Sequence, residues 1–190
     1  YPESIAFEEY AQFLGGVAAL GPDAIEVWNE ENIDFEWPAG QIDPASYVNN
    51  MLAPAYNAIK SANPNVMVIG GALAPTGYFG GGCSANGCDD NAYLAGMAAA
   101  GAANYMDCMG VHYNAGATSP SATSGHPAGG THYSWYLQPM LSTYSVLGKP
   151  LCITELGYLS GQDYGGLPDR FSWAGNTTVD QHAAWLAEAV

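Results

Sequence analysis

Positively charged side chains are scarce in this chain. Lysine and arginine number three, Lys60, Lys149 and Arg170, against 18 aspartate and glutamate residues, which gives a formal net charge of −15. Three cations cannot form a surface that follows a phosphate backbone, so nucleic acid is not an expected partner. The same shortage disfavours binding to an anionic membrane. The acidic balance indicates a self-repelling surface and says nothing about the fold.

Several sequence patterns are also missing. No run of 18 apolar residues is present, so no transmembrane helix is expected. No Gly-x-Gly-x-x-Gly follows an apolar run, which weakens a nucleotide-binding fold, and the lack of Gly-x-Ser-x-Gly makes an acyl hydrolase the weakest enzyme alternative. The hydrophobic share of 48% over 190 residues is sufficient for one domain, residues 1–190, with a real core.

The chain has four cysteines, two of them close together. Cys83 and Cys88 flank a Ser-Ala-Asn-Gly loop, a spacing that predicts a local disulfide and an oxidising, extracellular location. A zinc site would need two further ligands nearby, and none lies in this loop, so no metal site is expected. Cys108 and Cys152 lie in strand-like runs, where they are either buried thiols or a second bridge between neighbouring strands.

Helical and strand-like patterns alternate along the chain. The periodicity predicts helices over 4–20, 44–62, 90–103, 132–147 and 177–190. It predicts apolar strands over 24–30, 66–71, 106–113 and 151–156. Pro54 lies inside the second helical pattern, where a kink is expected because proline removes a backbone donor.

This alternation predicts an α/β fold with a parallel sheet and helical crossovers. Every long loop follows a strand, whereas the turns after helices are short, an asymmetry typical of a (β/α)8 TIM barrel. A complete barrel takes about 250 residues, and only four strands are found, so we expect an incomplete barrel. A doubly wound open sheet is the alternative.

Two of the predicted strands carry a glutamate at their C-terminal end. Glu30 ends the run Glu26-Val27-Trp28-Asn29-Glu30, and Glu155 follows Leu151-Cys152-Ile153-Thr154. The C-terminal ends of barrel strands are where catalytic residues lie, and a pair of carboxyl groups is what a glycosidase needs. The alternative is that both are solvated carboxylates, as most glutamates are.

Polar and aromatic residues accompany the two glutamates. His112 and Tyr113 end the strand between them, and they are candidates for contacting substrate or orienting a carboxylate; a capped strand end is the alternative. The chain also holds 13 tyrosines and five tryptophans. Trp37, in the loop after Glu30, is the best candidate for a sugar platform, with packing that anchors the loop as the alternative.

The clusters Trp28-Asn29-Glu30, His112-Tyr113 and Thr154-Glu155-Leu156-Gly157 resemble the clan of retaining glycoside hydrolases with (β/α)8 barrels, families 5 and 39 being the nearest. The resemblance implies that Glu30 is the acid/base on strand four and Glu155 the nucleophile on strand seven. It implies that Asn29 contacts a sugar hydroxyl and that His112 and Tyr113 are active-site residues on strand six. No metal or organic cofactor is implied.

The chain departs from that clan in two ways. The clan usually has Asn-Glu-Pro, whereas Glu31 follows Glu30, and this extra carboxylate either raises its neighbour's proton affinity or points to solvent. Strands one to three and eight, which carry an active-site Arg and Trp, are not found.

The resemblance as a whole predicts a secreted hydrolase of β-linked glycans. The alternative is an inactive structural or carbohydrate-binding subunit, which associates with itself or with a complementary segment.

Overall fold

The computed structural model describes residues 2–190, which contacts divide into two compact units. The first unit comprises the residues up to Val111 together with Tyr144–Thr154, and the second comprises His112–Thr143 and Glu155–Val190. The expectation of one domain over 1–190 stays a prediction beside this division.

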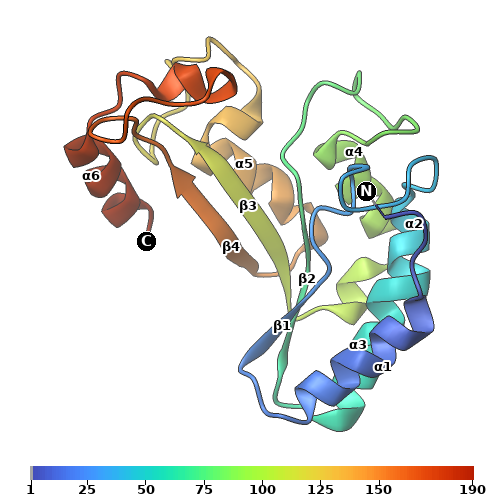
Figure 1. Cartoon of the computed structure of the whole chain (residues 1–190). Helices are drawn as coiled ribbons and strands as arrows, with labels where there is room; N and C mark the ends of the chain where they lie inside the picture. The colour runs from blue at the N-terminus through green and yellow to red at the C-terminus, as the bar shows by residue number, and fades with distance from the viewer. Residues whose placement is uncertain (1) are drawn as a thin grey trace. The chain divides into compact units, whose positions relative to one another are not determined.

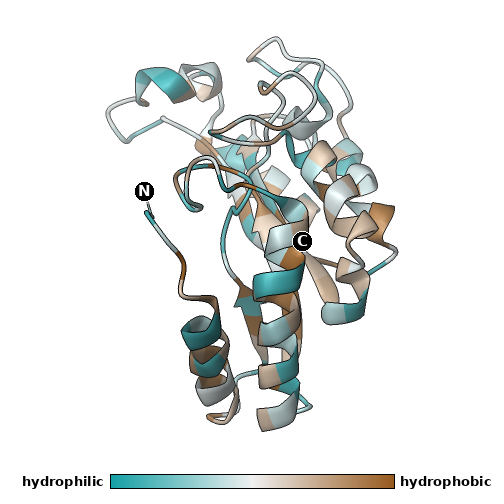
Figure 2. Ribbon diagram, turned by 90° about the vertical axis from the view of Figure 1, so that its right-hand side faces the viewer, coloured by the Kyte–Doolittle hydropathy of each residue, from teal (hydrophilic) through white to brown (hydrophobic). Residues whose placement is uncertain are grey.

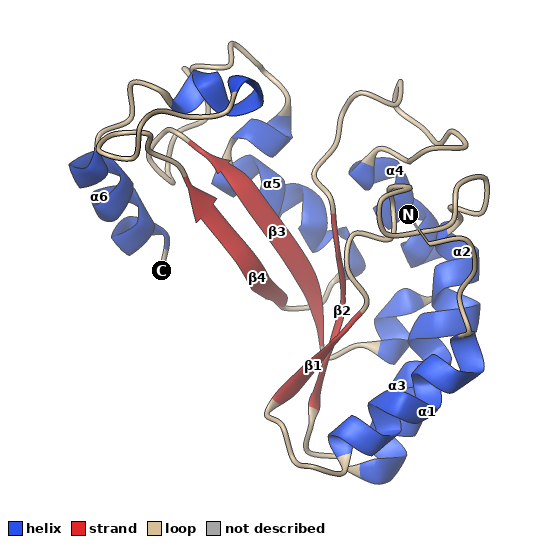
Figure 3. Cartoon of the chain, viewed as in Figure 1, coloured by secondary structure: helices blue, strands red, loops and turns tan. Residues whose placement is uncertain are grey.

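Four parallel strands form one sheet in the order of the sequence (Figure 3). They are β1 (Ala24–Val27), β2 (Met67–Leu73), β3 (Cys108–Gly116) and β4 (Leu151–Tyr158). In the first unit, Ala24 pairs with Met67 on β2, and Ile69 of β2 pairs with Cys108. Because β1 and β4 each have one neighbour, they are the edges of the sheet.

The predicted barrel-type fold is wrong. The structure has one open four-stranded parallel sheet with helices, whereas a TIM barrel closes eight strands on themselves. Apolar strands joined by helices indicate parallel pairing, but they do not indicate whether the two edges meet. The α/β class and the four parallel strands are as expected, and the strand count is compatible with part of a barrel.

Helices line the first unit, as Figure 1 shows. They are α1 (Phe7–Ala18), α2 (Pro44–Ser46), α3 (Ala53–Ala62) and α4 (Asp90–Ala99), followed by a 3-10 turn, η2 (Ala102–Tyr105). Helices α1 and α3 lie side by side, and a Cβ added at Gly15 would come within 3.4 Å of the Ala58 carbonyl oxygen. Hydrophobic and hydrophilic residues alternate along α1 (Figure 2), which buries Leu14 and Ala18.

The helix that contains Pro54 is interrupted one turn earlier. A π-helical segment, η1 (Tyr47–Leu52), joins α2 to α3, and Pro54 lies in the first turn of α3. Proline has no N–H to donate to the preceding turn, so a wider turn there accommodates the missing bond. The expected kink is therefore a π-helical insertion, and it places the Tyr47 ring in the interior.

The second unit combines the C-terminal parts of β3 and β4 with short helices. These are η3 (Tyr133–Trp135), α5 (Leu137–Tyr144), η5 (Asp169–Ala174) and α6 (Val179–Ala189); η4 (Ser145–Leu147) follows α5 in the first unit. Tyr113 and Tyr158 pack edge to face, with ring centroids 5.9 Å apart. Thr178 caps α6 through a reciprocal pair of bonds with Gln181. Among residues 2–190, no helix is both long and apolar enough to cross a bilayer.

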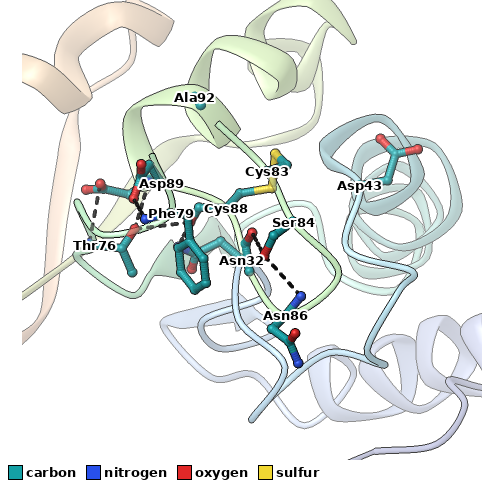
Figure 4. Close-up of a disulfide and its surroundings, with 12 residues drawn as sticks. Asn32, Asp43, Thr76, Phe79, Cys83, Ser84, Asn86, Cys88, Asp89 and Ala92 are labelled. Atoms are coloured by element: carbon teal, nitrogen blue, oxygen red, sulfur yellow. Dashed lines mark hydrogen bonds between the residues drawn. A yellow bond between two sulfur atoms is a disulfide. The ribbon is translucent and has the colours of Figure 1, made fainter. Parts of the chain in front are cut away.

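Two disulfides are present, both in the first unit. Cys83 and Cys88 form the predicted local bridge, and Figure 4 shows Ser84 and Asn86 in the loop that it closes. Cys108 and Cys152, left open by the sequence, form the second, which joins the beginnings of β3 and β4. Two disulfides are typical of proteins that fold in an oxidising compartment.

Candidate active site

The segment after β1 leaves the strand earlier than expected. β1 ends at Val27, because Trp28 (φ 76°) and Glu30 (φ 48°) adopt left-handed backbone conformations that strand residues do not. The Trp28 N–H donates to the Tyr10 hydroxyl at 3.1 Å, and the Glu30 N–H donates to the Ala72 carbonyl at 2.8 Å. Glu30 therefore lies in a strained, anchored turn of half-buried residues, a feature frequent at functional sites.

A buried asparagine ties this turn to its neighbours. Asn32 Nδ2 donates to the carbonyls of Ala74, at 2.9 Å, and Cys88, at 3.1 Å, while its Oδ1 accepts from the Ala74 N–H at 2.8 Å. Figure 4 shows Asn32 beside the Cys83–Cys88 bridge. The side chain thus joins three segments, the turn after β1, the end of β2 and the disulfide loop.

Glu31, the departure from the clan pattern, is fully buried and does not point to solvent. Burial raises the pKa of its carboxyl well above the ordinary value, and the nearby Glu26 and Glu30 raise it further, while its own backbone N–H opposes them. The sequence offered no signal for this burial, since a glutamate beside a glutamate is ordinarily exposed.

The acidic side chain of β1, Glu26, bridges strands within the first unit. Glu26 Oε1 accepts from the Ala72 N–H at 3.1 Å and from the Thr154 hydroxyl at 2.9 Å. A Cβ at Gly110 would come within 2.6 Å of that oxygen, so glycine is needed there. Sequence reasoning did not select Glu26. The available signal was the alternation of burial along β1. Ile25 and Val27 are buried on one face of the strand, so Glu26 between them points to the other face.

In the second unit, two side chains of β3 meet the predicted nucleophile. Asn114 Nδ2 donates to Glu155 Oε2 at 2.7 Å, and His112 Nδ1 lies 3.5 Å from the same oxygen. His112 is buried, whereas the Glu155 side chain is 46% exposed. Glu155 is not the last residue of its strand, because β4 continues to Tyr158. The carboxylate is thus held on one side and open on the other.

Alternation along β3 separates the two residues predicted for strand six. His112 and Asn114, two positions apart, share the face that meets Glu155, while Tyr113 points away and donates to the Trp135 carbonyl at 3.1 Å. Burial raises the pKa of Tyr113 above its ordinary value. The structure thus brings His112 to Glu155 and adds Asn114, which the same two-residue spacing would have indicated.

Trp37 is held by packing. It is 1% exposed, it stacks edge to face with Trp28 and Tyr47, and its indole N–H donates to the Gln41 carbonyl at 2.9 Å. No ring face remains open for a sugar, so the alternative of loop-anchoring packing describes it. Asn29 is half-buried in the turn between Trp28 and Glu30.

A second aromatic group lies in the second unit and was not predicted. The His126 ring stacks on Trp135, with centroids 4.6 Å apart, and on Trp173 at 5.0 Å. His126 Nε2 bonds to the Ala115 carbonyl at 2.7 Å, and Nδ1 accepts from the Ala128 N–H at 3.2 Å. Burial lowers the pKa of this histidine, although the bond to Ala115 opposes the shift.

Glu30 belongs to the first unit and Glu155 to the second, so the convergence of the two carboxyls on one sugar stays a prediction. Comparison with family models, with curated proteins and with solved structures gave no significant match.

Proposed function

We propose that this chain carries the two catalytic carboxyls of a retaining glycoside hydrolase acting on β-linked glycans. The observation that carries the proposal is the setting of Glu155: Asn114 donates to its carboxylate, His112 lies beside it, and nearly half of the side chain remains accessible. The hydrogen bond from Asn114 fixes the orientation of the carboxylate, and the exposed part leaves it open to attack a substrate, which is what a nucleophile needs.

The reaction has two steps. Glu155 attacks the anomeric carbon while Glu30 transfers its proton to the leaving oxygen, so the glycosidic bond breaks as a glycosyl-enzyme ester forms. Glu30 then takes a proton from water, which attacks the same carbon and releases Glu155. The substrate, water and the two carboxyl groups supply every proton and electron pair in these steps, so the reaction needs no cofactor. The strained backbone at Glu30 supports its role, because strain is retained where function requires a fixed group.

A mechanism-based label tests the proposal. A 2-deoxy-2-fluoro β-glycoside with an activated leaving group traps the glycosyl-enzyme, and peptide mapping then locates the ester. We expect the label on Glu155 and none in Glu155→Gln, with Glu188→Gln, an exposed glutamate of the same unit, labelled as the wild type is. An active chain labelled elsewhere would reject the assignment of Glu155.

The disulfides support an extracellular setting, and the partner proposed is a carbohydrate. The shortage of cations, three against 18 acidic residues, argues against nucleic acid and anionic membranes.

A second candidate function is a non-enzymatic, self-associating or carbohydrate-binding subunit. It is favoured by the edge strand β4, where Ile153, Thr154 and Glu155 are exposed, and by α6, in which no residue is buried. Sedimentation distinguishes the two functions. A stable homo-oligomer that is not labelled by the fluorosugar would favour the subunit, and a labelled monomer would favour the hydrolase.

A further inference from the structure

The carboxyl of Glu31 is enclosed without a hydrogen-bond partner from another described residue. Its side chain is 0% exposed, and neither Oε1 nor Oε2 has a hydrogen-bond partner in another residue of the described chain. Oε2 lies against the backbone of Gly71, where an added Cβ would be 2.7 Å away. The neighbouring Tyr47 hydroxyl is already occupied, since it donates to the Val27 carbonyl and accepts from the Gly71 N–H, both at 2.8 Å.

The groups that interact electrostatically with Glu31 are acidic or phenolic. Glu26 comes from β1, Glu30 from the same turn, Tyr10 from α1, Tyr47 from η1 and Tyr93 from α4. Among residues 2–190, no cation acts electrostatically on this carboxyl, and Lys60 on α3 is bound to Asp107 at 2.7 Å. An ionised carboxylate without a counter-charge costs several kcal/mol to bury, so the neutral acid is the form compatible with this site.

Glu31 is also joined directly to the strained turn. Glu30 precedes it with a φ of 48°, and the Glu30 N–H is held by the Ala72 carbonyl. Asn32 follows it, and the buried side-chain amide of Asn32 is hydrogen-bonded to the backbone of Ala74. The Glu30 backbone is therefore fixed between an anchored amide on one side and two buried side chains on the other.

We propose that Glu31 is a proton-dependent positioning residue, which as a neutral acid in the interior keeps the turn at Glu30 closed and on ionisation releases it. The inference rests on the proposed function only in naming Glu30 as the acid/base.

The direction of the pH effect is set by where the Glu31 carboxyl binds its proton more tightly, in the folded or in the unfolded chain. The folded chain binds the Glu31 proton more tightly than the unfolded chain does, since the pKa of this carboxyl is raised. The stabilisation is therefore complete below about pH 4.3, the ordinary glutamate value, and is lost as pH rises through the folded pKa. Within that window, opening of the turn becomes easier by up to about tenfold for each pH unit.

Amide hydrogen exchange measured by NMR tests this locally. The reporters are the Glu30 N–H, bonded to Ala72, and the Ala74 N–H, bonded to Asn32, with the Met109 N–H, bonded to the Pro150 carbonyl, as the reference outside the turn. Between about pH 4 and pH 8, we expect protection of the two turn amides, corrected for intrinsic exchange, to fall at least tenfold relative to Met109. Glu31→Gln, a neutral isostere, should abolish the fall, and the exposed Glu9→Gln should retain it.

A pH-independent protection ratio, or an unchanged fall in Glu31→Gln, would overturn the proposal. Should Glu31→Gln not fold, carboxyl-carbon NMR of the wild-type protein gives the answer, because titration of Glu31 in the ordinary glutamate range overturns it equally. None of these readouts uses activity. A chain that takes no fluorosugar label but shows the pH-dependent turn would reject the hydrolase and retain the positioning role.

Discussion

Asn114 and Glu155 are joined by a hydrogen bond of 2.7 Å between the amide nitrogen and a carboxylate oxygen. The two residues come from neighbouring strands, β3 and β4, and His112 approaches the same oxygen from two positions earlier on β3. A donor at this distance limits the rotation of the carboxylate. In the proposed reaction, this pair is what keeps Glu155 ready to attack.

Replacing Asn114 with alanine should therefore slow the reaction. A hydrogen bond to a charged group contributes about 1.5–3 kcal/mol, and half-exposure of Glu155 places this bond near the lower end, so we expect about a tenfold loss. The loss should appear in the rate of fluorosugar labelling and in kcat/KM on an activated aryl β-glycoside. Asn65→Ala, an exposed asparagine of the first unit, is the matched control. Equal rates in both variants would show that Asn114 does not assist Glu155.

The strands were predictable from the sequence, whereas the contact between Asn114 and Glu155 was not. Apolar runs bounded by turn residues were enough to predict four strands and their parallel pairing, and a five-residue spacing was enough for the Cys83–Cys88 bridge. Contacts between strands were not predictable in this way. Asn114 and the Cys108–Cys152 bridge depend on which strand lies beside which, and on the face each residue takes.

The turn after β1 shows a different limit. Left-handed backbone at Trp28 and Glu30 is rare for residues other than glycine, so an apolar run that includes Trp28 was expected to continue to residue 30. The burial of Glu31 likewise contradicts its local preference and depends on space provided by Gly71, forty positions later. Such local conflicts are expected at functional or strained sites.

Gly71→Ala should destabilise the first unit strongly. The new Cβ would lie 2.6 Å from the Val27 carbonyl oxygen and 2.7 Å from Glu31 Oε2, and the backbone oxygen cannot move aside cheaply. Overpacking of this kind costs about 1–3 kcal/mol in the free energy of unfolding, measured by urea denaturation. Gly16→Ala, on an exposed position of α1 with nothing within 4 Å, should instead stabilise by about 0.5–1 kcal/mol. The same sign for both variants would contradict the packing around Gly71.

The two disulfides should differ in their contribution to stability. Cys108–Cys152 closes a loop of 44 positions and Cys83–Cys88 one of five. In the chain-entropy description, loops of these lengths give about 4 and about 2 kcal/mol. The double variant Cys108→Ala/Cys152→Ala should therefore lose about twice the free energy of unfolding lost by Cys83→Ala/Cys88→Ala. Equal losses in urea denaturation would mean that strain or residual structure outweighs loop length.

The ring of His126 should make the second unit sensitive to acid. In the neutral ring, Nε2–H donates to the Ala115 carbonyl and Nδ1 accepts from the Ala128 N–H. Protonation at Nδ1 would place two N–H donors against each other, and burial opposes the charge, so the pKa of His126 is lowered. Because the pKa of His126 is lowered in the folded chain, the contribution of His126 to stability is complete above about pH 6.5. That contribution is lost as pH falls through the folded pKa.

This acid sensitivity is measurable from the fluorescence of Trp135 and Trp173, which stack on the His126 ring. The wild-type midpoint in urea should fall between about pH 7.5 and pH 5, the interval that brackets the ordinary histidine pKa. His126→Gln keeps a donor and an acceptor but does not titrate, so its midpoint should be lower throughout and less dependent on pH. His182→Gln, on α6, removes one histidine elsewhere in the same unit and should follow the wild type. If His126→Gln retained the full dependence on pH, the effect would belong to another group.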